Sequence, residues 1–349
     1  MSKEKISKLK VGISCGDLNG IGLEVVLKTF QDQRMLEMCT PVLYGVSRVM
    51  NYYKKSVGVQ DLDYHVAGDA NKLRSRKLNV IEVYDGDFKV SFGNADKVAG
   101  EIARRALVNA TEDLASNKLD VLITAPINKD TIHSEDFPYN GHTEYLADYA
   151  NEEHPLMLLV NDNLRVGLVT GHVALKEVSN VLTTELIVAK LDAMNKSLLS
   201  DFNIPSPRIA VLGLNPHSGD NGLLGEEEKT IIQPALEIAS KQGIMAFGPY
   251  PADGFFGSHA YKKFDGVLAM YHDQGLAPFK ALSFNAGVNF TAGLPIVRTS
   301  PDHGTGFDIA GQGVASEDSF RKAVYTALDI HENRKEYREL TKNPLSTKK

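Results

Sequence analysis

Short apolar runs alternate with longer segments of helical periodicity along most of this chain. The runs are rich in valine, isoleucine and leucine and end at Gly, Pro, Asn or His, which is typical of strands buried on both faces of a sheet. They predict strands at Val11–Ser14, Pro41–Tyr44, Val80–Val83, Val121–Ala125, Leu156–Val160, Val166–Thr170, Ile209–Leu214 and Val267–Tyr271.

Helices are predicted between these runs. The periodic segments are Gly100–Asn117, Thr184–Leu199, Glu226–Gln242 and Ser316–Glu332. Thr184 and Ser316 are expected as N-caps, and Gly243 as the residue that ends a helix. The alternation predicts α/β layers with a mostly parallel sheet, and 349 residues suit two domains around a cleft.

Composition narrows the function. A net charge of −6 without a long basic run argues against a nucleic-acid binder. No apolar run approaches the roughly 18 residues that span a bilayer, and the polar start of the chain lacks a signal sequence. Cys15 and Cys39 are too few for a disulfide framework. We therefore expect a soluble cytoplasmic protein.

Three histidines follow predicted strands within three residues. His172 comes after Val166–Thr170, His217 after Ile209–Leu214 and His272 after Val267–Tyr271. Ligands of open α/β sheets bind at the carboxyl ends of strands, so the three imidazoles are able to converge there on a divalent metal with one position left open for substrate. Structural hydrogen bonding by each histidine is the alternative.

Two aspartates lie near these histidines in the sequence. Asp273 directly follows His272 in what we expect to be a loop, and it is the candidate catalytic base, metal ligand or orienter of an imidazole. Asp253 is a second candidate, although Asp253-Gly254 is also an ordinary turn dipeptide.

Candidate anion-binding residues occur in three further places. Gly141-His142-Thr143-Glu144 precedes a helical stretch, where exposed N–H groups attract anions, unless Thr143 simply caps the helix. Lys280, Asn289 and Arg298 are isolated polar residues in apolar or glycine-rich sequence. They suit either an anionic substrate or pairing with surface acids.

Two segments are rich in glycine. Gly16–Gly22 follows the first strand, but its spacing is not GxGxxG, so we do not interpret it as a Rossmann fingerprint. The segment Asp302–Gly313 intersperses His, Thr and Asp among glycines and predicts a ligand loop.

The motifs together resemble the 4-hydroxythreonine-4-phosphate dehydrogenase family of pyridoxal phosphate biosynthesis, over nearly the whole chain. The resemblance rests on Gly16-Asp17 with Gly20-Ile21-Gly22, Gly141-His142-Thr143-Glu144, Asn215-Pro216-His217, Ala269 through Leu276, and Arg298-Thr299-Ser300 through Asp302-His303-Gly304-Thr305. The chain departs from the family at Leu18, Asn19 and Leu23, where Pro, Ala and Pro are common, and by an insertion in its N-terminal half. We expect these changes to affect the stiffness of the loop rather than any chemical group.

The resemblance implies an isocitrate/isopropylmalate dehydrogenase-like fold rather than a Rossmann domain, and a homodimer with shared active sites. It implies a metal (Zn, Mg, Co or Mn) on His172, His217 and His272, and substrate binding by His142, Thr143, Lys280, Asn289 and Arg298. It also places the adenosine end of NAD on His303, Gly304, Thr305, Asp308 and Gly311. We expect an outer cofactor domain at 1–134 plus 277–349 and a central metal and dimer domain at 135–276.

The reaction expected from the resemblance is NAD-dependent oxidation of 4-phosphooxy-L-threonine to a β-keto acid, which decarboxylates to 3-amino-2-oxopropyl phosphate. One alternative is a paralogue that oxidises threonate or erythronate 4-phosphate. Metal-dependent phosphate hydrolysis and ligand binding without catalysis are further alternatives.

Overall fold

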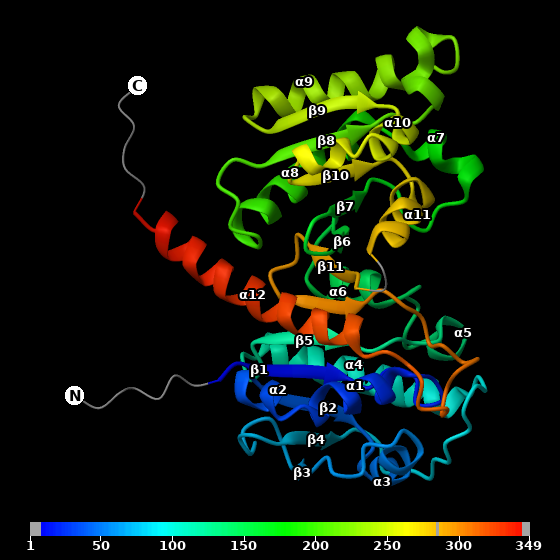
Figure 1. Cartoon of the computed structure of the whole chain (residues 1–349), viewed down its shortest axis with the longest axis vertical. Coiled ribbons are helices and arrows are strands. Elements are labelled where there is room, and N and C mark those ends of the chain that lie inside the picture. The colour runs from blue at the N-terminus through cyan, green and yellow to red at the C-terminus, as the bar shows by residue number, and fades with distance from the viewer. Residues whose placement is uncertain (1–7, 284–285, 344–349) are drawn as a thin grey trace. The chain divides into compact units, whose positions relative to one another are not determined.

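The computed structural model describes residues 8–283 and 286–343 and divides into two compact units. The first unit comprises Met1–Leu146 with Ile296–Leu328, and the second comprises Ala147–Pro295 with Asp329–Lys349. Both units are therefore discontinuous in sequence (Figure 1). The sequence predicts boundaries between a cofactor domain and a central metal and dimer domain at 134/135 and 276/277. That assignment of roles stays a prediction.

The sheet of the first unit has the order β3-β4-β2-β1-β5-β12, and all of its strand pairs are parallel. Its strands are β1 (Lys10–Ser14), β2 (Thr40–Gly45), β3 (Tyr64–Ala67), β4 (Leu78–Glu82), β5 (Val121–Thr124) and β12 (Arg298–Pro301). The central strands β1, β2 and β5 are almost entirely buried, as their continuous apolar runs predict.

Helices cover both faces of this sheet. The helices of this unit are α1 (Gly22–Gln31), α2 (Gln33–Met38), α3 (Ser47–Ser56), α4 (Lys97–Ala115), α5 (Lys129–Ile132), the start of α6 (His142–Tyr149) and the first part of α12 (Asp318–Thr341). Tyr44 donates a hydrogen bond to Asp113 of α4, and Thr299 donates one to the carbonyl of Ala323 in α12. The strand register puts Tyr44 and Thr299 on opposite faces, so α4 and α12 cover opposite sides.

The second unit has the sheet order β11-β6-β7-β10-β8-β9. Its strands are β6 (Leu156–Val160), β7 (Arg165–Leu168), β8 (Arg208–Leu212), β9 (Met245–Tyr250), β10 (Gly266–Ala269) and β11 (Val288–Ala292). β6 is antiparallel to β7 and β11, whereas the remaining pairs are parallel. The carboxyl ends of β7, β8 and β10 therefore meet at one edge.

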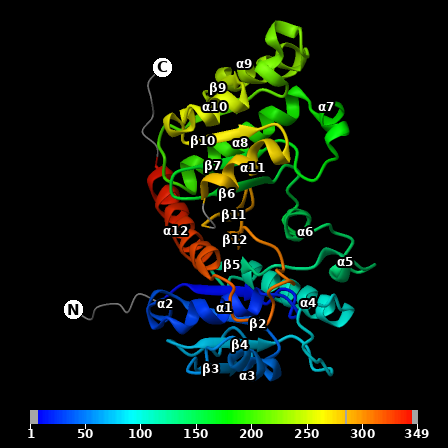
Figure 2. The same ribbon diagram turned by 45° about the vertical axis from the view of Figure 1, so that its right-hand side comes forward.

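The helices of the second unit are α8 (Thr184–Ser200), α9 (Gln233–Lys241), α10 (Ala252–Gly257), α11 (His272–Ser283) and the short α7 (Val178–Val181). Four shorter helical turns complete it, namely η1 (Leu175–Glu177), η2 (Pro216–Gly222), the π-turn η3 (Glu228–Ile232) and η4 (Ala260–Lys263). Helix α12 is one continuous helix whose second half belongs to this unit (Figure 2).

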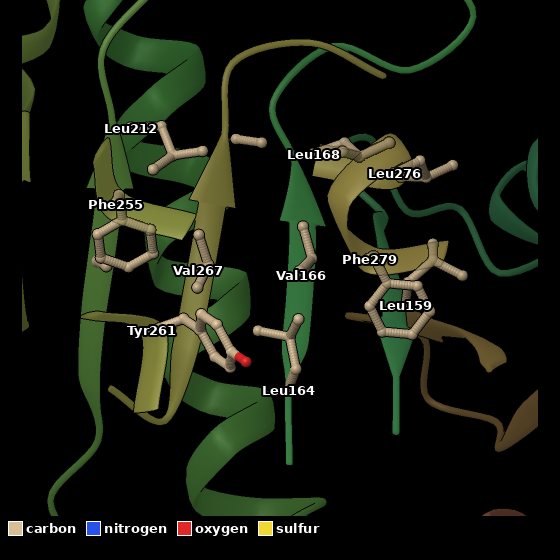
Figure 3. Close-up of a cluster of buried hydrophobic side chains, with 12 residues drawn as sticks. Leu159, Leu164, Val166, Leu168, Leu212, Phe255, Tyr261, Val267, Leu276 and Phe279 are labelled. Atoms are coloured by element: carbon tan, nitrogen blue, oxygen red, sulfur yellow. The ribbon is translucent and has the colours of Figure 1, made fainter. Parts of the chain in front are cut away.

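A cluster of buried apolar side chains attaches α10 and α11 to the sheet of the second unit. Figure 3 shows Leu276 and Phe279 of α11 beside Val166 of β7, with Phe255 of α10 near Val267 of β10. On the opposite face, Gly266 leaves room for the side chains of α8, because a β-carbon there would lie 2.7 Å from Met194. The resulting helix–sheet–helix layers hold the strand ends rigidly.

The structure contains all eight strands and all four helices predicted from the sequence, with shifted ends. Gly243 ends α9 with a φ of 82°, as predicted. The N-cap of α8 is Thr183 rather than Thr184, because the Thr183 hydroxyl accepts a hydrogen bond from the Leu186 amide. Within the described residues, no helix combines the length and apolar character needed to cross a bilayer.

Candidate active site

The three predicted metal-binding histidines all follow the carboxyl ends of strands in the second unit. His172 lies beyond β7, His217 in the η2 turn beyond β8, and His272 is the first residue of α11, beyond β10. The expectation that Asp273 lies in a loop is wrong, because Asp273 is in the first turn of α11. A carboxylate in a first helical turn is favourable because it faces the positive end of the helix dipole.

His172 and His272 lie side by side, with their ring centroids 5.9 Å apart. Nδ1 of His272 is 2.7 Å from Oδ1 of Asp273, so the carboxylate orients this imidazole and leaves its Nε2 available. Both rings and Asp273 line a pocket of about 370 Å³. An imidazole held by a carboxylate on one nitrogen is the arrangement that presents the other nitrogen to a metal.

His217 lies on a left-handed turn. His217, Ser218, Asp220 and Asn221 have φ values between 41° and 58°, a region that non-glycine residues rarely adopt. Such strain persists only where the surrounding structure enforces it, and it is concentrated at functional sites.

Glu228 holds the residues that lead into the His217 turn. Its side chain is buried, and its Oε1 accepts hydrogen bonds of 2.7 Å from the amides of both Leu214 and Asn215. Its Oε2 accepts a further bond of 3.0 Å from Nδ2 of Asn215. Glu228 begins the π-turn η3, a rare conformation that often marks functional sites.

Gln274 connects the strand ends that carry His217 and His272. Its Oε1 accepts from the Met270 amide at 2.7 Å, and its Nε2 donates to the Gly213 carbonyl at 2.6 Å. Gln274 also lines a second pocket of about 320 Å³, together with His217 and Asp253. Asp253 thus lies on the His217 side, whereas Asp273 lies beside His272.

The metal centre predicted from three histidines is only partly assembled within one chain. His172 and His272 share one pocket, and His217 lines the neighbouring one, with Tyr271 lining both. Residues 8–283 and 286–343 contain no group of three His, Cys, Asp or Glu side chains arranged to hold a metal. The donor set nevertheless fits a borderline divalent ion, because two imidazoles and an orienting carboxylate are together.

Lys280 and Asn289 also belong to the second unit. Lys280 lies two turns along α11 from His272 and is exposed. Asn289 is half-buried on β11, and its Oδ1 is buried with no hydrogen-bond partner among the described residues. A buried acceptor without a partner is a candidate for ligand contact.

The first unit brings two further predicted substrate residues together, namely the buried cation Arg298 and the imidazole of His142. Arg298 on β12 is 2% exposed, and its Nε and Nη2 donate to Oγ1 of Thr124 on β5 at 3.0 and 2.7 Å. Burial lowers the pKa of Arg298 to about 10, and the charge of Glu144 opposes this shift. The guanidinium therefore stays charged at neutral pH and is held by a neutral hydroxyl.

His142 faces this cation from the start of α6. Burial lowers the pKa of His142 well below its usual 6.5, and the charges of Arg298 and Lys129 lower it further. Its Nε2 is buried with no hydrogen-bond partner among the described residues. His142 is thus a neutral imidazole beside a fixed positive charge, while Thr143 follows in the same helical turn. This arrangement suits an anionic group of a ligand.

The two glycine-rich segments lie against each other in the first unit. The Ile21 amide donates to the Thr305 carbonyl at 2.8 Å, and a β-carbon on Gly20 would lie 2.6 Å from that same oxygen. Gly311 has a φ of 76°, which favours glycine. In the 303–313 segment, His303 is half-buried, whereas Gly304 and Asp308 are exposed. An exposed carboxylate beside open backbone fits the hydroxyl groups of a ribose.

Comparison with known proteins identifies the family. The model of the pyridoxal phosphate biosynthetic protein PdxA matches residues 37–327. The chain belongs to the PdxA family. A 4-hydroxythreonine-4-phosphate dehydrogenase from Bacteroides thetaiotaomicron is 50% identical over 97% of this chain and 93% of its own length. A putative D-threonate 4-phosphate dehydrogenase from Oceanobacillus iheyensis is 38% identical over 95% of this chain and 99% of its own.

Solved structures support the PdxA assignment and the fold. A 4-hydroxythreonine-4-phosphate dehydrogenase from Klebsiella pneumoniae is 32% identical with a TM-score of 0.79, covering 94% of this chain and 99% of its own. An isocitrate dehydrogenase from Methylococcus capsulatus, 11% identical with a TM-score of 0.50 over 96% and 89% of the chains, shares the fold alone. The predicted resemblance and fold class are confirmed.

Several residues that organise the site of this PdxA-family chain were not predicted from the sequence. Thr124 and Glu228 belong to no motif, and Gln274 lies in the Ala269–Leu276 motif without a predicted role, because each acts through a partner outside its own segment. Asn19 was expected to affect loop stiffness, but its contacts were not predicted. Its side-chain amide is fully buried and forms hydrogen bonds with residues 91 and 94.

Proposed function

We propose that this protein is an NAD-dependent, metal-requiring 4-hydroxythreonine-4-phosphate dehydrogenase of pyridoxal 5′-phosphate biosynthesis. The observation that carries the proposal is the pairing of His172 and His272 at the strand ends, with Asp273 orienting His272. The 50% identity to a relative of that name supports the choice of substrate.

In this proposal His172, His217 and His272 hold one divalent ion. The position of His217 in a separate pocket supports a site that is completed by a second copy of the chain. We therefore propose a homodimer with shared active sites. When bound, the metal supplies positive charge that lowers the pKa of the substrate hydroxyl.

The residues of the first unit bind the charged groups of the substrate. Arg298, fixed by Thr124, supplies a permanent positive charge, and His142 offers the unpartnered Nε2 as a donor. Thr143 adds a hydroxyl, and Lys280 and Asn289 are the remaining proposed substrate-binding residues. Such contacts keep the reacting carbon in one orientation.

The reaction transfers a hydride from the substrate carbinol carbon to C4 of the nicotinamide, while the hydroxyl proton goes to a base. Asp253 and Asp273 are the candidate bases. Asp253 is the better placed to accept a proton, since Asp273 already holds Nδ1 of His272. The β-keto acid then loses carbon dioxide, because the ketone accepts the electron pair of the breaking bond. His303, Gly304, Thr305, Asp308 and Gly311 hold the adenosine end of NAD.

A second candidate substrate is a four-carbon sugar-acid phosphate. The relative from Oceanobacillus iheyensis is named for D-threonate 4-phosphate, and it covers 95% of this chain. This substrate lacks the amine of 4-phosphooxy-L-threonine but carries the same phosphate and hydroxyl groups. The chemistry at the site is otherwise the same.

The test is NADH formation from 4-phosphooxy-L-threonine, compared with D-threonate and D-erythronate 4-phosphates at equal concentrations. We expect the amino-acid phosphate to be oxidised with the highest kcat/KM, and a chelator to abolish the activity. Preference for a sugar-acid phosphate would select the second candidate. Phosphate release without NAD would contradict a dehydrogenase, and full activity of His217→Ala with chelator present would contradict the metal site.

A further inference from the structure

Asn19 connects the first glycine-rich loop to the loop formed by residues 91–94. Its Oδ1 accepts a hydrogen bond of 2.7 Å from the Ser91 amide, and its Nδ2 donates one of 3.0 Å to the Asn94 carbonyl. The Asn19 carbonyl also accepts from the Gly93 amide at 2.9 Å. Asn19 is fully buried, so a single residue satisfies three main-chain groups of this loop away from water.

The 91–94 loop that Asn19 holds contacts the 303–313 segment. A β-carbon on Gly93 would lie 2.8 Å from the Phe307 carbonyl oxygen, and one on Gly311 would lie 2.2 Å from the ring of Phe92. Phe92 is itself fixed by aromatic packing against Tyr52 and Tyr53. Residues 92 and 93 thus contact two separate points of the 303–313 segment.

The chain next to Asn19 contacts the same segment at its start. Ile21 donates to the Thr305 carbonyl, and Gly20 lies directly against that carbonyl. Asn19 therefore lies between two sets of contacts that surround residues 305–311. Removing its side-chain amide would delete two of the three hydrogen bonds to the 91–94 loop and leave the bond from the Gly93 amide to the Asn19 carbonyl, with Gly20 and Ile21 in place.

We propose that Asn19 is a positioning residue for the dinucleotide-binding segment, acting through the 91–94 loop that it holds. This inference rests on the proposed function, in which residues 303–311 bind the adenosine end of NAD. A loop that must be ordered on binding weakens affinity, because part of the binding free energy is spent on ordering it. Asn19 keeps the segment ordered before the dinucleotide arrives.

The first test compares Asn19→Ala with Asn79→Ala in the full-length protein. Asn79 is also fully buried in the first unit, with its side chain bonded to the main chain at Arg74, Pro41 and Lys77. Both variants lose buried amide hydrogen bonds, so both should melt at lower temperature. We expect only Asn19→Ala to raise the Kd for NADH, roughly tenfold, with the KM for the phosphorylated substrate unchanged.

A second pair of variants tests the contact without removing a buried side chain. Gly93 and Gly58 have φ values of 76° and 75°, so an alanine carries the same backbone strain at each. A β-carbon at Gly58 meets nothing within 4 Å, whereas one at Gly93 meets the Phe307 carbonyl. We expect Gly93→Ala to weaken NADH binding and Gly58→Ala to leave it unchanged.

NADH binding is measured from the change in nicotinamide fluorescence, with kcat and both KM values from steady-state assays. A Kd for Asn19→Ala within about twofold of the wild type would overturn the inference, as would equal weakening by Asn79→Ala or Gly58→Ala. Wild-type protein that binds no NADH but is otherwise folded would overturn the proposed function, which distinguishes the two failures.

Discussion

The buried pair Arg298–Thr124 allows a sharp test of the anion site. We consider Thr124→Val, which replaces the hydroxyl with a methyl group of similar volume and so creates no cavity. Thr124 is fully buried, and its Oγ1 accepts from Nε and Nη2 of Arg298. The variant therefore removes the hydroxyl that accepts from two charged N–H groups.

The size of the effect follows from those two contacts. A hydrogen bond to a charged group contributes about 1.5–3 kcal/mol, and a buried charged donor left unpaired costs at least as much as a neutral one. The two bonds share one oxygen, so they are not additive. We expect Thr124→Val to lower the free energy of unfolding by roughly 2–4 kcal/mol. Arg298 also loses its fixed orientation, which should raise the KM for the phosphorylated substrate about tenfold or more.

Thr29→Val provides the matched control. Thr29 is fully buried in α1 of the same unit, and its Oγ1 has no hydrogen-bond partner among the described residues. The same chemical change there removes an unsatisfied group, so stability should be unchanged or slightly increased. Urea denaturation followed by circular dichroism measures both variants, and steady-state assays measure KM and kcat.

The outcome that contradicts this reasoning is equal behaviour of the two variants. Equal loss of stability would mean that any Thr-to-Val change in this unit is destabilising. An unchanged KM in Thr124→Val would mean that the orientation of Arg298 does not affect substrate binding. Thr124→Ser keeps the hydroxyl, so its stability and its KM for the phosphorylated substrate should stay close to those of the wild type.

Two further predictions concern histidines. The pKa of His142 lies well below 6.5 in the folded state. As pH falls below about 6.5, the unfolded state therefore takes up the proton first, and the free energy of unfolding declines by at most about 1.4 kcal/mol per pH unit. His142→Gln should lose less stability than the wild type between about pH 6.5 and 5, measured by urea denaturation; parallel curves would refute the neutral imidazole. Asp273→Asn should weaken Zn²⁺ binding by about 10- to 100-fold in calorimetric titration, because His272 loses its orienting carboxylate; an unchanged affinity would remove Asp273 from that role.

The sequence by itself determined the layered α/β architecture and where its chemistry lies. Continuous apolar runs such as Ile209–Leu214 mark strands buried on both faces, because no polar residue interrupts them. Histidines within three residues after such runs lie at the carboxyl edge of the sheet. These signals are local, so the pattern of residue types is enough to show them.

Elements without a strong local pattern were missed. β12 has the sequence Arg-Thr-Ser-Pro, and its buried Arg298 donates hydrogen bonds to Thr124 on the neighbouring strand β5. Helix α11 contains Pro278, which obscured the helical pattern and made His272 and Asp273 look like loop residues. In both cases the surrounding structure outweighs the intrinsic preference of the segment.

Only the tertiary structure decided which residues support the site. Thr124 and Arg298 are 174 positions apart, Asn19 and Ser91 are 72 apart, and Gln274 meets Gly213 across 61. No local periodicity relates such pairs, because their contact depends on strand order and register. The sequence shows which groups carry the chemistry, and the packing of distant segments shows what holds them in place.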